Sequence, residues 1–191
     1  YADLNFLDFW DTTYPDGFFY QLYFAQPEVP EQELGGRLDE FIRKFFYSLS
    51  GDRPGDESLL IQPPGTTDLL ASTTVPDPFP SWLTEQEISD YVDAFTEGGL
   101  TGPINRYRAQ VFDADGLRPY GERMIEAPTI FIGGDRDPSR ELAPGMDTYP
   151  SPLDRASDPR GNYLIPGVGH WVQQEAPHTV NGILLDFLAK I

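Results

Sequence analysis

Two short apolar runs in the last third of the chain constrain its fold more than any other feature. Residues 127–132 read APTIFI and residues 162–165 read NYLI, without the alternation of polar and apolar side chains that a half-exposed strand shows. Strands buried on both faces have this pattern, as in a parallel sheet that helices cover. Two strands cannot complete such a sheet, and the N-terminal part offers one further candidate at residues 4–9. We therefore expect the first strands of the sheet to lie on sequence that is not part of this chain.

The first two thirds of the chain predicts helices joined by excursions. Residues 31–49 carry apolar side chains three and four positions apart, which is the spacing of an amphipathic helix, and Gly51 is suited to end it. Residues 52–83 hold several prolines and glycines around one short apolar run at 59–61. This composition predicts an excursion over the surface.

Three further helices begin at recognisable signals. Residues 84–87 read TEQE, a capping box, and the glycines at 98–99 end the helix that follows. Pro103 suits the first helical position, which predicts another helix over residues 104–111. Pro177 opens a final helix. Its apolar positions form one stripe, made of Val180, Ile183, Leu184, Phe187 and Leu188.

Composition excludes several classes of partner. The formal net charge is −18, from 31 acidic and 13 basic residues, and such a surface repels nucleic acids and anionic membranes. There is no cysteine, which excludes disulfides, thiolate chemistry and cysteine-ligated metals. No apolar run approaches the length that spans a bilayer. We expect a cytoplasmic protein with no nucleic-acid partner and no membrane partner.

Each apolar run is followed at once by a loop with chemically active side chains. Asp135 and Asp137 follow the first run, and His170 follows the second on a glycine-hinged loop. In open α/β sheets, functional groups collect at the carboxyl ends of the strands. A carboxylate beside an imidazole fixes the tautomer of the ring and stabilises the imidazolium. We predict His170 as a general base and Asp137, which lies further from the strand end than Asp135, as its acid partner; ordinary surface loops are the alternative interpretation.

Two strings in the first two thirds carry a family resemblance. Residues 18–28 read FFYQLYFAQPE and resemble the cap segment of α/β-hydrolase-fold epoxide hydrolases, in which a YQLYFQ-like string carries a catalytic tyrosine. Residues 98–108 read GGLTGPINRYR and resemble the GFxGPLNWYR string that carries the second tyrosine. With the two loops above, four motifs follow in the family's order from about residue 17 to the C-terminus. The departures are Ala25 in place of a glutamine and Arg106 in place of a tryptophan, and neither occupies a catalytic position.

The resemblance implies an α/β-hydrolase fold, in which a mostly helical cap is inserted in a core built on a mainly parallel sheet. Only the cap and the last strands and helices of the core would be present here. Residues 17–115 correspond to the cap and residues 116–191 to the C-terminal part of the core. Residues 1–16 are a core remnant or a lead-in to the cap.

The resemblance also implies roles for single residues. Tyr20 and Tyr107 correspond to the cap tyrosines that donate hydrogen bonds to the epoxide oxygen, Asp137 to the acid and His170 to the base. The chain has ten tyrosines, most of which we expect to pack, and Tyr23 is the nearest decoy. Aromatic side chains near these positions suggest an apolar cavity for a lipophilic epoxide. The predicted substrate-binding residues are Phe19, Phe24 and Trp171.

The chemistry of an epoxide suits these residue types. Phenols have an ordinary pKa of about 10 and stay protonated at neutral pH, so they can donate to an oxygen that gains negative charge. A carboxylate attacking carbon from the other side leaves an ester, and water activated by His170 with Asp137 hydrolyses it to a vicinal diol. This scheme needs no metal and no organic cofactor.

The family's nucleophile motif is absent from this sequence. No GxDxG-like elbow precedes Tyr20, and Asp8, in FLDFW, lacks the small neighbours that a tight turn needs. The missing aspartate would then lie on an N-terminal half, in the same chain or on a separate polypeptide. The alternatives are a dehalogenase of the haloalkane or fluoroacetate type, an esterase with a serine in the missing part, and a non-catalytic binding module. A homodimer is one option for its assembly, and the oligomeric state stays open.

Overall fold

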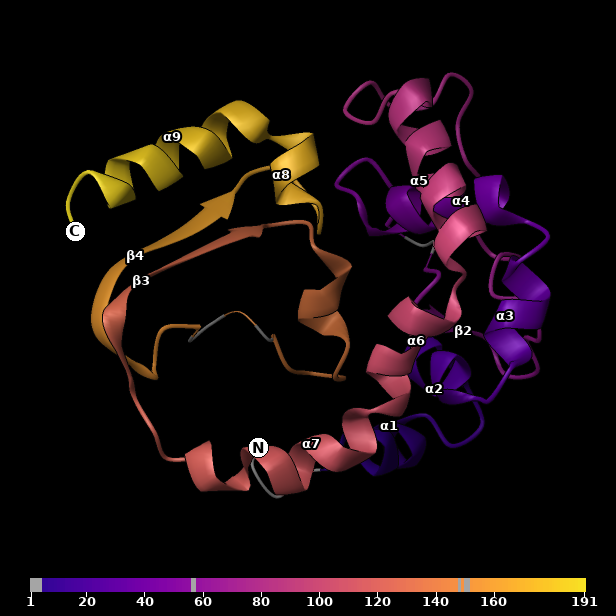
Figure 1. Cartoon of the computed structure of the whole chain (residues 1–191), viewed down its shortest axis with the longest axis horizontal. Coiled ribbons are helices and arrows are strands. Elements are labelled where there is room, and N and C mark those ends of the chain that lie inside the picture. The colour runs from indigo at the N-terminus through magenta and orange to yellow at the C-terminus, as the bar shows by residue number, and fades with distance from the viewer. Residues whose placement is uncertain (1–4, 56–57, 148, 150–151) are drawn as a thin grey trace. The chain divides into compact units, whose positions relative to one another are not determined.

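The computed structural model describes residues 5–55, 58–147, 149 and 152–191 (Figure 1). The chain divides into two compact units. The helical unit comprises Tyr1–Ser48, Gly55–Asp77 and Thr84–Glu122, and the sheet unit comprises Leu49–Pro54, Pro78–Leu83 and Arg123–Ile191. No helix among the described residues is long and apolar enough to cross a membrane.

Short helices make up most of the helical unit. One small antiparallel sheet pairs Phe18 with Gln62 and Phe19 with Ile61. Helix α2 packs against α6, and α1 packs against both α2 and α7. The elements in chain order are α1 (Phe6–Thr13), β1 (Phe18–Phe19), α2 (Tyr20–Ala25), α3 (Val29–Leu34), α4 (Leu38–Leu49), β2 (Ile61–Gln62), α5 (Glu85–Gly98), α6 (Thr101–Arg108), α7 (Gln110–Leu117) and the 3-10 turn η1 (Arg118–Tyr120).

The helix predicted over residues 31–49 is wrong as a single element, because the chain forms α3 and α4 with a break between them. Two consecutive glycines, Gly35 and Gly36, occupy the break, and each costs about 1 kcal/mol relative to alanine inside a helix. Glu28, in the left-handed backbone region at φ 66°, precedes α3, which starts earlier than predicted. The amphipathic pattern itself continues across the break.

The strand predicted at residues 4–9 is also wrong over the residues that the structure describes. Leu4 lies outside them, Asn5 is the N-cap residue, and Phe6 begins α1. The side chain of Asn5 accepts hydrogen bonds from the backbone N–H groups of Leu7 and Asp8, at 3.1 and 3.5 Å. Such a cap satisfies donors that a helix start would otherwise leave unpaired, so it favours a helix here.

The predicted boundaries of α5 are confirmed, whereas those of the helix predicted over residues 104–111 are wrong, because α6 ends at Arg108 and α7 begins at Gln110. Thr84 and Glu87 form the capping box reciprocally, and Gly99 follows α5 with φ 72°. Helix α6 begins at Thr101, ahead of the predicted start at residue 104, and ends at Arg108. The excursion at residues 52–83 contains one described strand, β2, yet it also supplies buried side chains to the core of the helical unit. These are Leu59, Leu60, Leu69 and Leu70.

Two parallel strands form the centre of the sheet unit. Strand β3 (Ile125–Gly134) pairs with β4 (Ala156–Ile165), and both extend beyond the predicted runs. The 3-10 turn η2 (Pro138–Glu141) follows β3, and helices α8 (Val172–Glu175) and α9 (Pro177–Leu188) follow β4. Figure 1 shows α9 lying along one side of the strand pair. A small apolar core joins them, made of Ile165, Val168, Val172 and Val180, with Ile132 and Ala176 against it.

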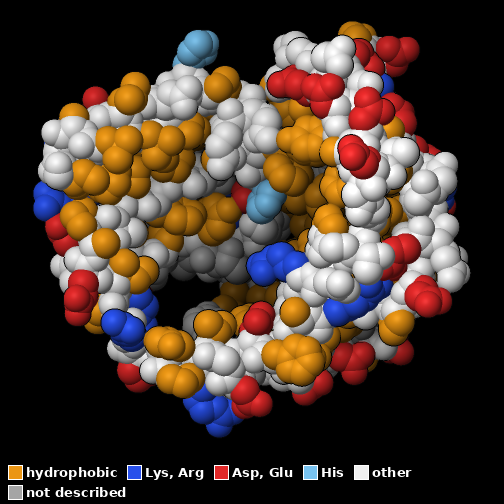
Figure 2. Space-filling model, in the orientation of Figure 1, with side chains coloured by type: hydrophobic (Ala, Val, Ile, Leu, Met, Phe, Trp, Pro, Cys, Tyr) orange, Lys and Arg blue, Asp and Glu red, His pale blue; other side chains and the backbone are white. Residues whose placement is uncertain are grey.

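Much apolar surface of the sheet unit is exposed. Tyr163 and Leu164 on β4 are exposed, although their run has the pattern of a doubly buried strand, and Ile125 at the start of β3 is exposed as well. Of the predicted stripe on α9, Val180 is buried, whereas Leu188 is 58% exposed. Figure 2 shows hydrophobic side chains over β3, β4 and α9. The described strands and helices therefore do not cover this sheet as its sequence pattern requires.

The two units and the division predicted from sequence differ in three places. Residues 49–54 and 78–83 belong to the sheet unit, although they lie within the predicted cap at 17–115. The helical unit continues to Glu122. The assignment of residues 17–115 and 116–191 to a cap and a core stays a prediction.

Gly51 allows two backbone segments of the sheet unit to touch. A Cβ atom at Gly51 would lie 2.0 Å from the carbonyl oxygen of Gly167, and one at Gly169 would lie 2.4 Å from the nitrogen of Gly51. The backbone of Gly51 does not adopt the left-handed conformation typical of a helix-ending glycine. The absence of a side chain at Gly51 thus lets its backbone approach the loop after β4. Helix α4 ends two residues earlier, at Leu49.

Replacing Gly51 with alanine should destabilise the protein by about 1–3 kcal/mol, the usual range for overpacking, because backbone must move to admit the methyl group. Urea unfolding of the purified protein measures this. Gly36→Ala is the matched control, since nothing lies within 4 Å of a Cβ atom there. Equal stability of the two variants would contradict the close approach.

Candidate active site

Asp137 and His170 meet at the carboxyl ends of β3 and β4. The parallel register pairs Gly134 with Ile165, so the loops that follow leave the sheet side by side. The Nδ1 atom of His170 lies 2.9 Å from Oδ2 of Asp137. Asp137 is only 4% exposed, whereas the side chain of His170 is 41% exposed. A buried carboxylate thus holds one ring nitrogen, and the other remains available for proton transfer.

Further hydrogen bonds hold the carboxylate of Asp137. The backbone N–H of Ser139 donates to Oδ1 at 2.7 Å, and the hydroxyl of Tyr149 donates to Oδ2. Burial alone would raise the pKa of Asp137, but the bonds to His170, Tyr149 and Ser139 hold that pKa below its ordinary value. The carboxylate therefore stays charged at neutral pH.

Asp135, the rival acid in the sequence, has a different contact. Its Oδ1 atom accepts a hydrogen bond from the backbone N–H of Gly167 at 2.7 Å, and its side chain is exposed. The backbone N–H of Arg136 also donates to the carbonyl of Val168, at 2.9 Å. These bonds connect the loop after β3 to the loop after β4. Asp135 therefore stabilises the contact between the two loops, whereas Asp137 contacts the histidine.

Glu175 holds the histidine loop from the other side, and sequence reasoning missed it. Its Oε2 atom accepts hydrogen bonds from the N–H groups of Gly51 and Gly169 at 2.8 and 3.0 Å, and Oε1 accepts one from Trp171 at 3.1 Å. The backbone N–H of His170 donates to the carbonyl of Leu49 at 2.8 Å. A glutamate five residues after the histidine, just before a helix-opening proline, was the available signal.

Tyr20 and Tyr107 lie together in the helical unit. Tyr20 is the first residue of α2, Tyr107 lies near the end of α6, and their ring centroids are 5.8 Å apart with planes at 78°. Burial raises the pKa of Tyr107 to about 12, with a further contribution from Tyr20. Both rings are partly buried. Tyr107 therefore remains a protonated donor across the neutral pH range.

The predicted substrate contacts Phe19 and Phe24 are 1% and 2% exposed. Phe24 stacks on Tyr107 with centroids 4.9 Å apart, and Phe19 contacts Tyr20 edge-on at 5.1 Å. In the helical unit they thus support the two tyrosine rings. Trp171, in the sheet unit, contacts His170 edge-on with centroids 4.9 Å apart. A substrate-binding role for these three residues stays a prediction.

Two glutamine side chains form a hydrogen-bonded chain that ends at the Tyr20 hydroxyl, and the sequence analysis gave them no role. Gln21 Nε2 donates to the Tyr20 hydroxyl at 2.7 Å, and Gln110 Nε2 donates to Gln21 Oε1 at 3.2 Å. An amide that donates to a phenol oxygen leaves the phenol proton for another acceptor. Tyr23, the decoy, is buried and packs against Phe24, and burial raises its pKa above the ordinary value.

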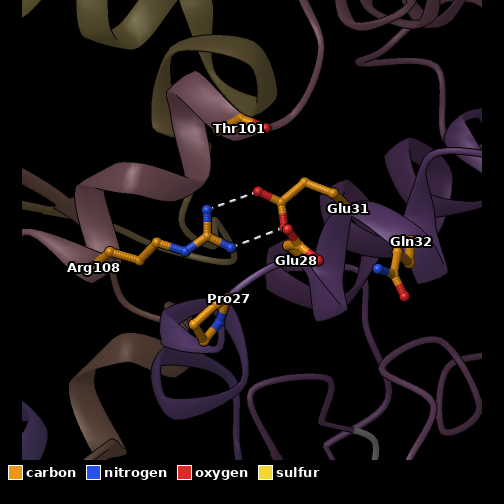
Figure 3. A pocket seen from close by; sticks show the side chains of 6 residues that line it. All are labelled: Pro27, Glu28, Glu31, Gln32, Thr101 and Arg108. Atoms are coloured by element: carbon orange, nitrogen blue, oxygen red, sulfur yellow. Dashed lines mark hydrogen bonds and ion pairs between the residues drawn. The ribbon is translucent and has the colours of Figure 1, made fainter.

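An ion pair fixes α6 beside Tyr107. Arg108 donates to both carboxylate oxygens of Glu31, at 2.7 and 2.8 Å, and to the carbonyl of Gln26 at 2.8 Å. Figure 3 shows this pair within a pocket of about 540 Å³ in the helical unit. Because the guanidinium and the carboxylate pair with each other, we interpret this ion pair as a structural link between α3 and α6. The pocket is lined by Pro27, Glu28, Glu31, Gln32, Thr101 and Arg108.

Among the described residues, no group of three or more histidine, aspartate or glutamate side chains is arranged to hold a metal ion.

The Glu31–Arg108 pair should make stability depend on pH. The bond from Arg108 lowers the pKa of Glu31 to about 2 from an ordinary value of 4.5, so its contribution is complete above pH 4.5 and is lost as the pH falls through 2. Glu31→Gln should reduce the free energy of unfolding by about 1 kcal/mol at pH 7. Urea unfolding at pH 7 and pH 3 should show the difference from wild type shrinking at the lower pH. Glu28→Gln, in the same pocket, is the control, and an equal loss at both pH values would contradict the pair's role.

The curated proteins that are similar to this chain in sequence share one activity in their names. Epoxide hydrolase A of Mycobacterium tuberculosis is 32% identical over 182 residues, which cover 92% of this chain and 53% of the relative. Epoxide hydrolase 1 of Siraitia grosvenorii is 30% identical over 175 residues, which cover 90% and 53%. The chain thus spans about half the length of these curated relatives. No protein-family model matches it.

Solved structures show the same likeness. The crystal structure of Epoxide Hydrolase A from Mycobacterium thermoresistibile aligns with a TM-score of 0.81 at 32% identity, over 95% of this chain and 55% of that one. An epoxide hydrolase from an endophytic Streptomyces aligns with a TM-score of 0.84 at 31% identity, over 96% and 55%.

Proposed function

Because the chain belongs to the epoxide hydrolase family of the α/β-hydrolase fold, we propose that it supplies the cap and the C-terminal part of the core of an enzyme that opens a lipophilic epoxide to a vicinal diol. One observation carries the proposal most directly. The pair of tyrosine donors and the carboxylate–histidine pair, identified separately in the sequence, each meet within their own unit.

In the proposed first step, a carboxylate attacks one ring carbon of the epoxide and the bond from that carbon to the ring oxygen breaks. The oxygen leaves as an alkoxide and takes a proton from Tyr20 or Tyr107 while the other donates a hydrogen bond. The raised pKa of Tyr107 keeps its proton in place until charge develops on the oxygen. The product of this step is an ester between the enzyme and the substrate carbon.

In the proposed second step, His170 removes a proton from water, and the hydroxide adds to the carbonyl carbon of the ester. Asp137 stabilises the resulting imidazolium. The ester C–O bond then breaks, the diol oxygen takes the proton from the imidazolium, and the nucleophile is released as a carboxylic acid. That acid returns one proton through solvent to the tyrosinate left by the first step, which restores both the carboxylate and the tyrosine. The short Nδ1 contact and the burial of Asp137 support this assignment of roles.

We propose that the nucleophile lies on an N-terminal half, on the same chain or on a separate polypeptide. The chain spans about half of its relatives, and the apolar surface left exposed on β3, β4 and α9 supports further strands and helices packing there. A parallel sheet of two strands is also far short of the usual size. A lipophilic substrate follows from the aromatic surroundings of the tyrosines. A homodimer and a cytoplasmic location stay predictions.

Replacing His170 with glutamine in the complete enzyme should leave ester formation intact and block its hydrolysis. Intact mass spectrometry after mixing with an epoxide such as styrene oxide should then show an adduct of the substrate's mass, while diol production falls by at least about a thousandfold. Asp135→Asn is the control, because asparagine keeps an acceptor for Gly167. A His170 variant with normal turnover would overturn the assignment.

Replacing Tyr20 and Tyr107 together with phenylalanine should abolish ester formation itself, because no donor would remain for the leaving oxygen. Rapid mixing followed by mass spectrometry measures the rate of that step. Tyr23→Phe is the matched control, since Tyr23 shares the helix with Tyr20 and packs in the core. Ester formation at the full rate in the double variant would sink the tyrosine assignment.

A further inference from the structure

We propose that Tyr149 is a positioning residue for the Asp137–His170 pair, because its hydroxyl donates to the same carboxylate oxygen of Asp137 that contacts the histidine. The Tyr149 hydroxyl keeps the Asp137 carboxylate in its orientation. It also weakens the interaction of that carboxylate with a protonated His170. This proposal rests on the proposed function, since it assigns a role in the ester-hydrolysis step. Nothing in the sequence signalled it, because Tyr149 lies in a loop twelve residues beyond the aspartate.

Donors surround the carboxylate of Asp137 on both oxygens. Oδ1 accepts from the backbone N–H of Ser139 at 2.7 Å, and Oδ2 accepts from Tyr149 and faces Nδ1 of His170 at 2.9 Å. The hydroxyl oxygen of Ser139 also lies 3.4 Å from the hydroxyl oxygen of Tyr149. Rotation of the carboxylate would break bonds on both oxygens at once. Tyr149 therefore helps to keep Oδ2 directed at the histidine.

The ring of Tyr149 is itself held in place. It contacts Phe131 of β3 edge-on with centroids 5.0 Å apart, and the guanidinium of Arg140 lies 5.7 Å from its centre. Gly133 makes room for the ring, because a Cβ atom there would lie 2.7 Å from a ring carbon. Asp147 in turn binds Arg140 through two hydrogen bonds. These contacts fix the ring of Tyr149 so that its hydroxyl lies at Oδ2 of Asp137.

The protonation state of Tyr149 suits a permanent donor. Burial, followed by its bond to Asp137, raises the pKa of the Tyr149 hydroxyl to about 12. It thus keeps its proton across the neutral pH range. Donation to Oδ2 spreads the negative charge of Asp137, which reduces how strongly the carboxylate stabilises a protonated His170.

Other charges face this group and stay in place when Tyr149 changes. Arg53, on the segment after α4, interacts electrostatically with Asp137, with Glu141 on η2 and with Arg136. Arg140 faces Tyr149, and Glu175 of α8 binds the backbone on both sides of His170. A change of Tyr149 alone therefore isolates the effect of its hydroxyl against a constant background.

The sign of the effect follows from these charges. Without the Tyr149 hydroxyl, Asp137 holds the imidazolium more strongly, so His170 becomes neutral only at a higher pH. Ester hydrolysis needs the neutral imidazole as its base. The acid limb of the hydrolysis rate should therefore move to higher pH, and ester formation, which does not use His170, should not change.

The test replaces Tyr149 with phenylalanine in the complete enzyme, which keeps the ring and removes the hydroxyl. Single-turnover mixing with styrene oxide and mass spectrometry give the rates of ester formation and hydrolysis from pH 5 to pH 9. We expect formation within about twofold of wild type and an acid limb of hydrolysis moved up by about half a unit to one unit, which is about a three- to tenfold loss below it. Tyr163→Phe, on β4, is the control and should change neither.

Two further measurements keep the proposal falsifiable. Incorporation of 3-fluorotyrosine at position 149 makes the hydroxyl a stronger donor and should move the acid limb down. Nuclear magnetic resonance titration of His170 should show the same two opposite shifts without any substrate. An unmoved limb and titration, or an equal loss in formation and hydrolysis, would overturn the role of Tyr149. Shifted titrations in an enzyme that forms no ester would support the positioning contact and reject the proposed function.

Discussion

The parallel pairing of β3 with β4 is the constraint on which the candidate chemistry of the sheet unit depends. Pairing of Gly134 with Ile165 starts two loops at the same edge of the sheet. Backbone bonds then bind loop to loop, and a Cβ atom at Gly134 would lie 2.1 Å from the carbonyl oxygen of Val168. With the loops this close, a carboxylate on one and an imidazole on the other meet at 2.9 Å. The glycines are thus as necessary to the pair as the side chains that form it.

The helical unit solves a different problem, which is to keep two phenols close together and protonated. Tyr20 and Tyr107 come from separate helices, and buried aromatic rings beneath them fix their positions. The same burial raises the pKa of Tyr107, so the packing of the ring also keeps its hydroxyl protonated. The Glu31–Arg108 ion pair also links α6 to α3 beside Tyr107. Stability and chemistry therefore depend on the same contacts.

Sequence reasoning identified the side chains whose signal is local. Asp137 and His170 each follow an apolar run, and the capping box at Thr84 satisfies its helix start with residues three apart. It failed where the deciding contact is distant or where local signals conflict: the glycines between α3 and α4 override a continuous amphipathic pattern, and Asn5 caps a helix in a stretch that also reads as a strand. The contact of Tyr149 with Asp137 and that of Glu175 with Gly51 form only because folding brings distant segments together, and no spacing rule detects them. The parallel pairing was predictable because its pattern extends over both strands.

A general base beside a buried carboxylate faces conflicting requirements. The carboxylate must hold the ring and stabilise the imidazolium, yet too strong a hold keeps the histidine protonated and unable to accept a proton from water. Burial of Asp137 strengthens its interaction with His170, because the local dielectric falls. Donors from Ser139 and Tyr149 act in the opposite direction by stabilising the charge on the carboxylate itself. In the proposed function, the balance between the burial of Asp137 and the number of donors to its carboxylate therefore sets how strongly the aspartate holds His170.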